Sequence, residues 1–409
     1  MFLSKDTVFK LKEKYGTPLY VYSESILRER CREMKNLLPN KNFRVNYSAK
    51  ANTNLEILKI IREEGLDVDA MSPGEIYIEQ LAGFDSNQIF YVSNNVSAEE
   101  MRFAIERNIL VGVDSISQLE MYGQINPGGK VAVRFNPGKG AGHHEKVITA
   151  GKKTKFGIQK ELVPQVKEII KKYNLTLAGI NQHIGSLFLD WRDYIEGVRS
   201  FLEIAKEFPN LSFLDLGGGF GVPYKPEESR LDLERLGKEL DIVLTEFLEE
   251  YPNKDIIFKI EPGRYIVAEC GVLLGSVNSV KTNYDTTYIG TDIGFNVLAR
   301  PVMYDSYHEM EIVKNSVGNN GVNEDTRIKA TIVGNICESG DILARDREIQ
   351  AAEVGDVLII YTAGAYGYSM SSNYNCRLRP AEVLIDLNGE DRLIRRRDTL
   401  ESLIQNFPV

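Results

Sequence analysis

The sequence predicts an α/β fold joined to a β domain: a (β/α)8 barrel, followed by a mostly antiparallel β-barrel or β-sandwich. Over the first two thirds of the chain, short β-rich runs alternate with helical patterns, as parallel strands linked by helices do. After about residue 266 the helical patterns largely stop, and β-rich runs separated by turns indicate a second domain. An open doubly wound sheet is the rival architecture for the first part.

The expected barrel strands are near-continuous apolar runs, which is typical of strands buried on both faces. They cover residues 43–48, 66–71, 89–93, 110–114, 130–136, 177–183, 212–216 and 255–260. Most intervals carry helical patterns, such as those at 55–64, 75–81, 98–107 and 191–208. In the second domain we expect strands at 272–280, 327–333, 357–362 and 382–386, with helical pieces only near 300–307 and in the tail. A strand-like segment at 18–22 precedes the barrel and can belong to either domain.

Composition and charge narrow the class of protein. The 409 residues are 43% hydrophobic and 26% charged, and their apolar runs fall short of the roughly 18 residues of a membrane span. The N-terminus lacks the apolar core of a secretory signal, so we expect a cytoplasmic protein. A net charge of −9 argues against a nucleic-acid partner.

The four scattered cysteines predict reduced thiols and no metal site. The polar stretch 315–325 predicts a mobile surface loop.

Four groups of candidate residues follow predicted barrel strands, at the end where such barrels carry their functional groups. Lys50 follows the first strand, and His183 ends the sixth. Gly217, Gly218 and Gly219 follow the seventh, and the segment Glu261-Pro262-Gly263-Arg264 closes the eighth. Each alone has an ordinary explanation: a solvated lysine, a tight turn or a satisfied core histidine.

Together these groups predict one cofactor. Consecutive glycines let backbone amides approach a phosphate closely. A lysine amine can condense with an aldehyde, and a carboxylate can pair with a protonated pyridine nitrogen. A flat imidazole can stack on an aromatic ring. Phosphate, aldehyde, pyridinium and planar ring together describe pyridoxal 5'-phosphate.

The motifs YSAKAN (47–52), HIGS (183–186), GGGFG (217–221) and EPGR (261–264), in this order, resemble those of the fold-type III pyridoxal-phosphate decarboxylases. That family includes diaminopimelate, ornithine and arginine decarboxylases and shares its barrel with alanine racemase. The resemblance spans roughly residues 15–400. It implies a cofactor-binding barrel over residues 24–265 and a β domain formed by residues 1–23 and 266–409.

Further segments are most similar to the diaminopimelate decarboxylases within that family. They are NPG (136–138) through GAGHH (140–144) and KFG (155–157), RPVMY (300–304), CESGD (337–341), AGAYGY (363–368), SNYN (372–375) and RPAE (379–382). One departure is TDIGFN at 291–296, where many members have a glycine pair after the aspartate.

The resemblance implies a role for each matching residue. In the cofactor site, Lys50 would bind the cofactor covalently, His183 would stack on its ring and Glu261 would hold the pyridine nitrogen. The other implied cofactor-binding residues, chiefly on the phosphate side, are Ser186, Gly217, Gly218, Gly219, Gly263, Arg264 and Tyr366. The implied substrate-binding residues are Arg264, Arg300, Tyr304, Glu338 and Tyr366. Cys337 would reprotonate the carbanion, and Cys337 and Glu338 would come from the partner subunit of a homodimer.

The implied reaction is decarboxylation of meso-2,6-diaminopimelate, a small amino acid, to L-lysine and carbon dioxide. Arginine matches a carboxylate and Glu338 matches an ammonium, as a substrate with two amino-acid ends requires. The runner-up is a decarboxylase of ornithine, lysine or a carboxynorspermidine-like substrate. A racemase that uses Tyr366 as its second base is less favoured, because the CESGD loop and the arginine-rich elements argue against it. A non-catalytic homologue is disfavoured because Lys50 and Cys337 are both present.

Overall fold

The computed structural model describes residues 2–92, 94–136, 138, 155–315 and 326–408. The chain divides into two compact units, which are described separately. The barrel unit comprises Arg28–Pro223 and Ser229–Ile266. The β unit comprises Met1–Leu27, Tyr224–Glu228 and Val267–Val409.

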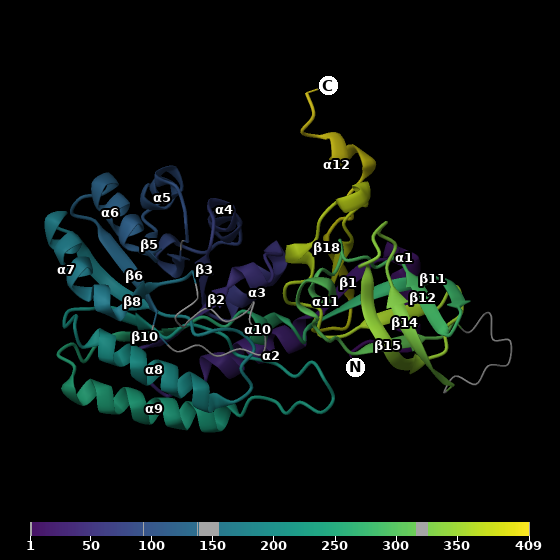
Figure 1. Cartoon of the computed structure of the whole chain (residues 1–409), viewed down its shortest axis with the longest axis horizontal. Coiled ribbons are helices and arrows are strands. Elements are labelled where there is room, and N and C mark those ends of the chain that lie inside the picture. The colour runs from purple at the N-terminus through teal and green to yellow at the C-terminus, as the bar shows by residue number, and fades with distance from the viewer. Residues whose placement is uncertain (1, 93, 137, 139–154, 316–325, 409) are drawn as a thin grey trace. The chain divides into compact units, whose positions relative to one another are not determined.

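Eight parallel strands form the closed barrel that the sequence predicts (Figure 1). In ring order they are β2 (Phe43–Ser48), β3 (Asp67–Ala70), β4 (Ile89–Val92), β5 (Leu110–Val113), β6 (Lys130–Asn136), β8 (Thr176–Asn181), β9 (Phe213–Asp215) and β10 (Ile257–Ile260). The ring closes where β10 pairs with β2, at Phe258 opposite Phe43. This closure excludes the open sheet. The short strand β7 (Ile158–Gln159) pairs with β6 alone.

The first helix of the barrel unit precedes its first strand, the last follows its final strand, and those between connect successive strands; several begin at a residue whose side chain caps them. They are α2 (Glu24–Lys35), α3 (Leu55–Glu63), α4 (Pro73–Leu81), α5 (Ala98–Ile105), α6 (Ile116–Ile125), α7 (Val163–Lys172), α8 (Trp191–Ala205), α9 (Leu233–Glu250) and α10 (Arg264–Val267). At α5, for example, the Ser97 hydroxyl accepts from the Glu100 amide while the Glu100 carboxylate accepts from the Ser97 amide. Their apolar faces are buried, as Ile57, Leu58 and Ile61 of α3 show.

The β unit is a mixed, mostly antiparallel sheet, as predicted. Its strands are β1 (Leu19–Ser23), β11 (Gly271–Asn283), β12 (Thr286–Thr291), β13 (Met310–Val313), β14 (Arg327–Val333), β15 (Ile342–Gln350), β16 (Val357–Ile360), β17 (Ala381–Ile385) and β18 (Asp391–Arg395). The N-terminal strand β1 lies between β11 and β17, antiparallel to the first and parallel to the second. Buried apolar side chains of these three strands, such as Val21, Val272 and Val383, share one core.

In the described part of the β unit, the helices that lie entirely within it are α1 (Lys5–Tyr15), α11 (Arg300–Tyr304) and α12 (Leu400–Ile404). Helix α1 was not predicted, because only Val8 and Leu11 of its residues are buried and its apolar periodicity is weak. Within the described ranges, no helix is both long and apolar enough to cross a membrane. The cysteines are free thiols, with Cys31 and Cys270 buried and Cys337 and Cys376 exposed.

Two sequence predictions concern residues that the structure does not describe. The expected surface loop at 315–325 lies outside the described residues except for Asn315. The GAGHH segment at 140–144 also lies outside them.

Candidate active site

Lys50 is presented by the first strand of the barrel. It lies in the 3-10 turn Ala49–Ala51, which directly follows β2, and its side chain is exposed. The preceding residue holds this turn against the end of β10, because the Ser48 amide donates to the Pro262 carbonyl over 3.2 Å. A side chain at Gly263 would place its Cβ 2.9 Å from Ser48 Cβ, so glycine allows this approach. The loops carrying Lys50 and Glu261 are therefore fixed to one another by backbone contacts.

The three glycines after β9 are required by the neighbouring strand ends. A Cβ at Gly217 would lie 2.2 Å from the Gln182 carbonyl oxygen, and one at Gly218 would lie 2.0 Å from the Glu261 carbonyl oxygen. Gly217 also has a φ of +78°, which disfavours side chains. The three glycines thus allow the ends of β8, β9 and β10 to contact one another directly. This close packing requires glycine at these positions whether or not a phosphate binds there.

His183 is held in one orientation by this glycine loop. Its Nδ1 accepts a hydrogen bond from the Gly218 amide over 3.2 Å. Burial, and then the positive charges of Lys50 and Arg134, hold the pKa of His183 well below its ordinary value. The ring is therefore neutral at physiological pH and carries its proton on Nε2. A neutral, oriented imidazole suits stacking on a flat ring.

Three buried carboxyl groups line the barrel at Asp69, Asp215 and Glu261. Ser48 Oγ donates to Asp69 Oδ2 over 2.7 Å, but in the described part of the chain no donor group reaches Asp69 Oδ1, Asp215 Oδ2 or Glu261 Oε1, and the Asp215 and Glu261 carboxyls can hydrogen-bond to each other only by sharing a proton. Burial, followed by the charges of Asp215 and Asp69, raises the pKa of Glu261 well above its ordinary value, and Lys50 opposes this rise. Such buried, partnerless oxygens need a donor or a cation. The mouth of the barrel is built to receive one.

Arg264, which follows β10, and Ser186, which follows β8, contact each other. Arg264 is the first residue of α10 and is 7% exposed. Its Nη2 donates to Ser186 Oγ over 3.3 Å. These two residues were predicted on the phosphate side of the cofactor, and the structure brings them together.

Arg300 and Tyr366 are brought together in the β unit. Arg300 begins α11 and is 3% exposed, and its Cζ lies 6.0 Å from the Tyr366 ring centroid and 5.1 Å from that of Tyr224. Tyr366 has a φ of +56°, an uncommon conformation for a tyrosine. Tyr304, at the other end of α11, is half-buried. A buried guanidinium between aromatic rings suits recognition of a carboxylate.

Cys337 and Glu338 lie on a loop that is anchored while their side chains stay exposed. Asp341 fixes the loop, because its carboxylate accepts from the amides of Ile336 and Phe295, each over 2.7 Å. The Cys337 amide donates to Asn375 Oδ1 over 2.9 Å, and the Tyr374 hydroxyl donates to Glu338. These contacts hold the backbone of Cys337 and the carboxylate of Glu338 in place.

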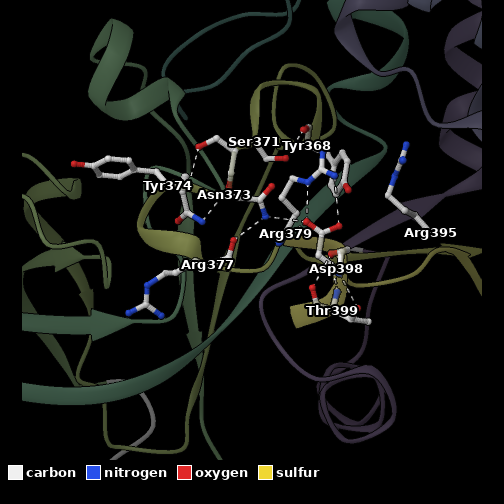
Figure 2. Close-up of polar contacts among 12 residues, drawn as sticks. Tyr368, Ser371, Asn373, Tyr374, Arg377, Arg379, Arg395, Asp398 and Thr399 are labelled. Carbon is white, nitrogen blue, oxygen red and sulfur yellow. Dashed lines mark hydrogen bonds and ion pairs between the residues drawn. The ribbon is translucent and has the colours of Figure 1, made fainter. Parts of the chain in front are cut away.

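The turn that contacts the Cys337 loop is itself held by Asp398. Figure 2 shows Asn373 and Arg379 converging on Asp398. Asn373 Nδ2 and Arg379 Nε each donate to Asp398 Oδ2 over 2.9 Å. Burial acts to raise the pKa of Asp398, but the hydrogen bonds from Arg379 and Asn373 outweigh it and leave that pKa lowered. The ion pair holds the 373–377 turn against which the Cys337 loop rests.

Sequence reasoning missed several residues of these two sites: Asp69, Arg134 and Asp215 in the barrel, and Tyr224 and His308 in the β unit. Three of them carried a readable signal. Asp69, Arg134 and Asp215 are charged residues within barrel strands, where burial is expected on both faces. Nothing local to Tyr224 or His308 marks them, because the fold alone brings them to Arg300.

Comparison with known proteins gives the family. The family model described as pyridoxal-dependent decarboxylase, pyridoxal binding domain, matches residues 24–268. The diaminopimelate decarboxylase of Methanothermobacter thermautotrophicus is 41% identical over 410 residues, covering 98% of this chain and 94% of that protein. The chain belongs to the diaminopimelate decarboxylase family.

Solved structures agree with membership of the diaminopimelate decarboxylase family. A crystal structure of a diaminopimelate decarboxylase superimposes with a TM-score of 0.92 at 32% identity, covering 99% of this chain and 96% of that one. The structure of the diaminopimelate decarboxylase from Methanocaldococcus jannaschii in complex with L-lysine gives a TM-score of 0.86 at 34% identity, covering 98% of this chain and 94% of that one. The predicted family and the predicted fold class are thereby confirmed.

Proposed function

We propose that this protein is a pyridoxal-phosphate-dependent carboxy-lyase that converts meso-2,6-diaminopimelate to L-lysine and carbon dioxide. The observation that carries the proposal is the buried, partnerless Oε1 of Glu261 at a barrel mouth that also holds Lys50 and a neutral His183. The high identity to diaminopimelate decarboxylases over nearly the whole chain supports the same substrate.

The residues present fit pyridoxal phosphate. Glu261 would share a proton between its Oε1 and the ring nitrogen, which supplies the missing hydrogen bond in a buried site. Lys50 would hold the cofactor covalently through its ε-amino group, and His183 would cover the ring face. Arg264 and Ser186, with Gly217, Gly218, Gly219 and Gly263, would bind the phosphate, and Tyr366 would contact the cofactor. We propose that residues 24–265 form this cofactor-binding barrel and that residues 1–23 and 266–409 form the β domain.

When bound, the cofactor accepts the electron pair that departing carbon dioxide leaves on the substrate α-carbon. The protein's part is to keep that sink effective and to control protons. Glu261 would keep a proton at the ring nitrogen, where its effect would be largest as negative charge develops. Cys337 would return a proton to the α-carbon after carbon dioxide has left.

Recognition of the second amino-acid end would come from the β unit. Arg300, with Tyr304, would bind the distal carboxylate, and Glu338 would bind the distal ammonium. Arg264 would also bind a substrate carboxylate, and Tyr366 would contact both the cofactor and the substrate. Because Cys337 and Glu338 are exposed in a single chain, we propose that they complete the site of the partner subunit in a homodimer.

A substrate panel tests the function. Purified, cofactor-loaded protein is offered meso-diaminopimelate, ornithine, arginine and lysine, and released carbon dioxide and products are measured. We expect carbon dioxide and L-lysine from meso-diaminopimelate in equal amounts. Preference for ornithine or lysine would transfer the proposal to the runner-up, and racemisation without carbon dioxide would replace it with a racemase.

A further inference from the structure

His308 lies beside the guanidinium of Arg300 and is 1% exposed. Arg300 Nε donates to His308 Nε2 over 3.3 Å, and Arg300 Nη2 donates to Ser306 Oγ over the same distance. Asp305, in a left-handed conformation, ends α11 and turns the chain back so that both partners reach the arginine that begins the helix. Two of the three guanidinium nitrogens are thus held by residues six and eight positions further along the chain.

The structure also decides which nitrogen of His308 carries a proton. His308 Nδ1 lies 2.9 Å from the Tyr361 carbonyl oxygen, which can only accept. Nδ1 is therefore the donor, and Nε2 keeps the lone pair that accepts from Arg300. A protonated ring would set an Nε2–H against the Arg300 Nε–H, so the contact requires the neutral ring.

His308 itself is fixed from several sides. Strand β13 begins two residues after it and pairs with β16, at Met310 opposite Ile360. Arg347 Nη1 donates to the His308 carbonyl over 3.0 Å, and the Tyr224 ring meets the imidazole edge-on at 5.2 Å. The imidazole is consequently a rigid acceptor tied to the sheet, whereas a bare arginine side chain has many rotamers.

We infer that His308 is a positioning residue that fixes the plane and rotation of the Arg300 guanidinium for the substrate carboxylate. This inference rests on the proposed function, in which Arg300 binds the distal carboxylate. A bidentate carboxylate contact depends on the orientation of the guanidinium plane. Loss of the Nε acceptor releases that plane while Arg300 and its charge remain. The effect therefore falls on substrate binding and leaves the reacting end unaffected.

Steady-state kinetics of two substitutions at one position test the inference. His308→Leu keeps the bulk and removes the acceptor, whereas His308→Gln places an amide oxygen near the position of Nε2. We expect His308→Leu to raise KM for meso-diaminopimelate about tenfold, with kcat within about twofold of the wild type. We expect His308→Gln to recover most of that loss. Arg300→Ala serves as the reference, and cofactor absorbance and thermal unfolding are measured for every variant.

The outcomes separate the inference from the function on which it rests. If Arg300→Ala raises KM and His308→Leu does not, the positioning role is wrong and the function stands. If His308→Leu and His308→Gln lower kcat, cofactor loading and thermal stability alike, His308 is merely structural and the inference is wrong. A wild type that does not decarboxylate meso-diaminopimelate overturns the function and the inference together.

Discussion

The barrel mouth and the Cys337 loop place reactive groups in opposite environments. At the mouth, Asp69, Asp215 and Glu261 are buried, and burial raises their pKa values. On the loop, Cys337 and Glu338 are exposed, with the Cys337 amide bound to Asn375 and the Glu338 carboxylate bound to the Tyr374 hydroxyl. Buried polar groups interact strongly because water does not screen them, whereas exposed ones are screened. Under the proposed function, one chain prepares its cofactor site by itself, whereas the loop groups are desolvated by a partner subunit.

Arg300 lies between these extremes. It is as buried as the barrel carboxylates, but its hydrogen bonds run to His308 and Ser306 within its own unit. Its environment is therefore set by the β unit, while its proposed partner is a substrate. Substitutions in the barrel mouth, at Arg300 and in the Cys337 loop should therefore differ in the size of their effect and in the property they change.

Lys50→Ala tests the barrel mouth and should have the largest effect. Removal of the amine that holds the cofactor should lower kcat by at least about 10³-fold, because this group acts directly in the reaction. Borohydride treatment of the wild type should fix the cofactor to one peptide, the one containing Lys50. Trapping on another lysine would contradict the assignment.

Arg300→Ala tests the β unit. Loss of a charge-assisted contact should cost about 2–4 kcal/mol in kcat/KM for meso-diaminopimelate, roughly 30- to 1000-fold. Lysine and ornithine as substrates should be affected much less, because they offer no distal carboxylate. Cofactor absorbance should be unchanged. Equal losses on all substrates would mean that Arg300 is structural or binds the reacting end.

Asp69→Asn tests whether burial governs protonation at the mouth. Burial, opposed by Lys50 and the Ser48 hydroxyl, raises the pKa of Asp69 from 3.8 to about 7. Between these values the folded protein holds a proton that the unfolded chain has released, so this group lowers stability as pH rises. Relative to the wild type, Asp69→Asn should therefore stabilise the cofactor-free protein more at pH 8 than at pH 5, with a difference of about 2–3 kcal/mol in the free energy of unfolding.

Denaturant unfolding at the two pH values measures this difference. Asp255→Asn, at an exposed position, is the control for loss of one carboxylate. An Asp69→Asn protein with the same pH dependence as the wild type would show that Asp69 does not retain its proton.

Mixing subunits tests the loop and should give the smallest signal. Lys50→Ala and Cys337→Ala proteins are each expected to be inactive, but a mixed dimer would contain one site with both wild-type groups. Random pairing should restore about a quarter of the activity of an equal quantity of wild-type sites. No recovery after verified exchange of subunits would show that Cys337 serves the site of its own chain or has no catalytic role.

Most of the fold was predictable because its signals are local. Barrel strands such as β2 and β6 coincide with their predicted ranges, because strands buried on both faces have near-continuous apolar sequences. The candidate residues at the mouth were also predictable, because each follows a strand at one end of the barrel. Helix α1 was not predictable, because its two buried residues are too few to give the sequence a recognisable helical periodicity of apolar residues.

The sequence alone determined the type of chemistry, and the tertiary structure decided the state of the groups that perform it. Lys50, Gly217–Gly219 and Glu261 are recognisable in the chain as residue types at strand ends. The partnerless oxygen of Glu261 and the neutral ring of His183 are not, because protonation depends on burial and on charges distant in sequence. The same holds for His308, whose acceptor nitrogen is selected by a carbonyl 53 residues away.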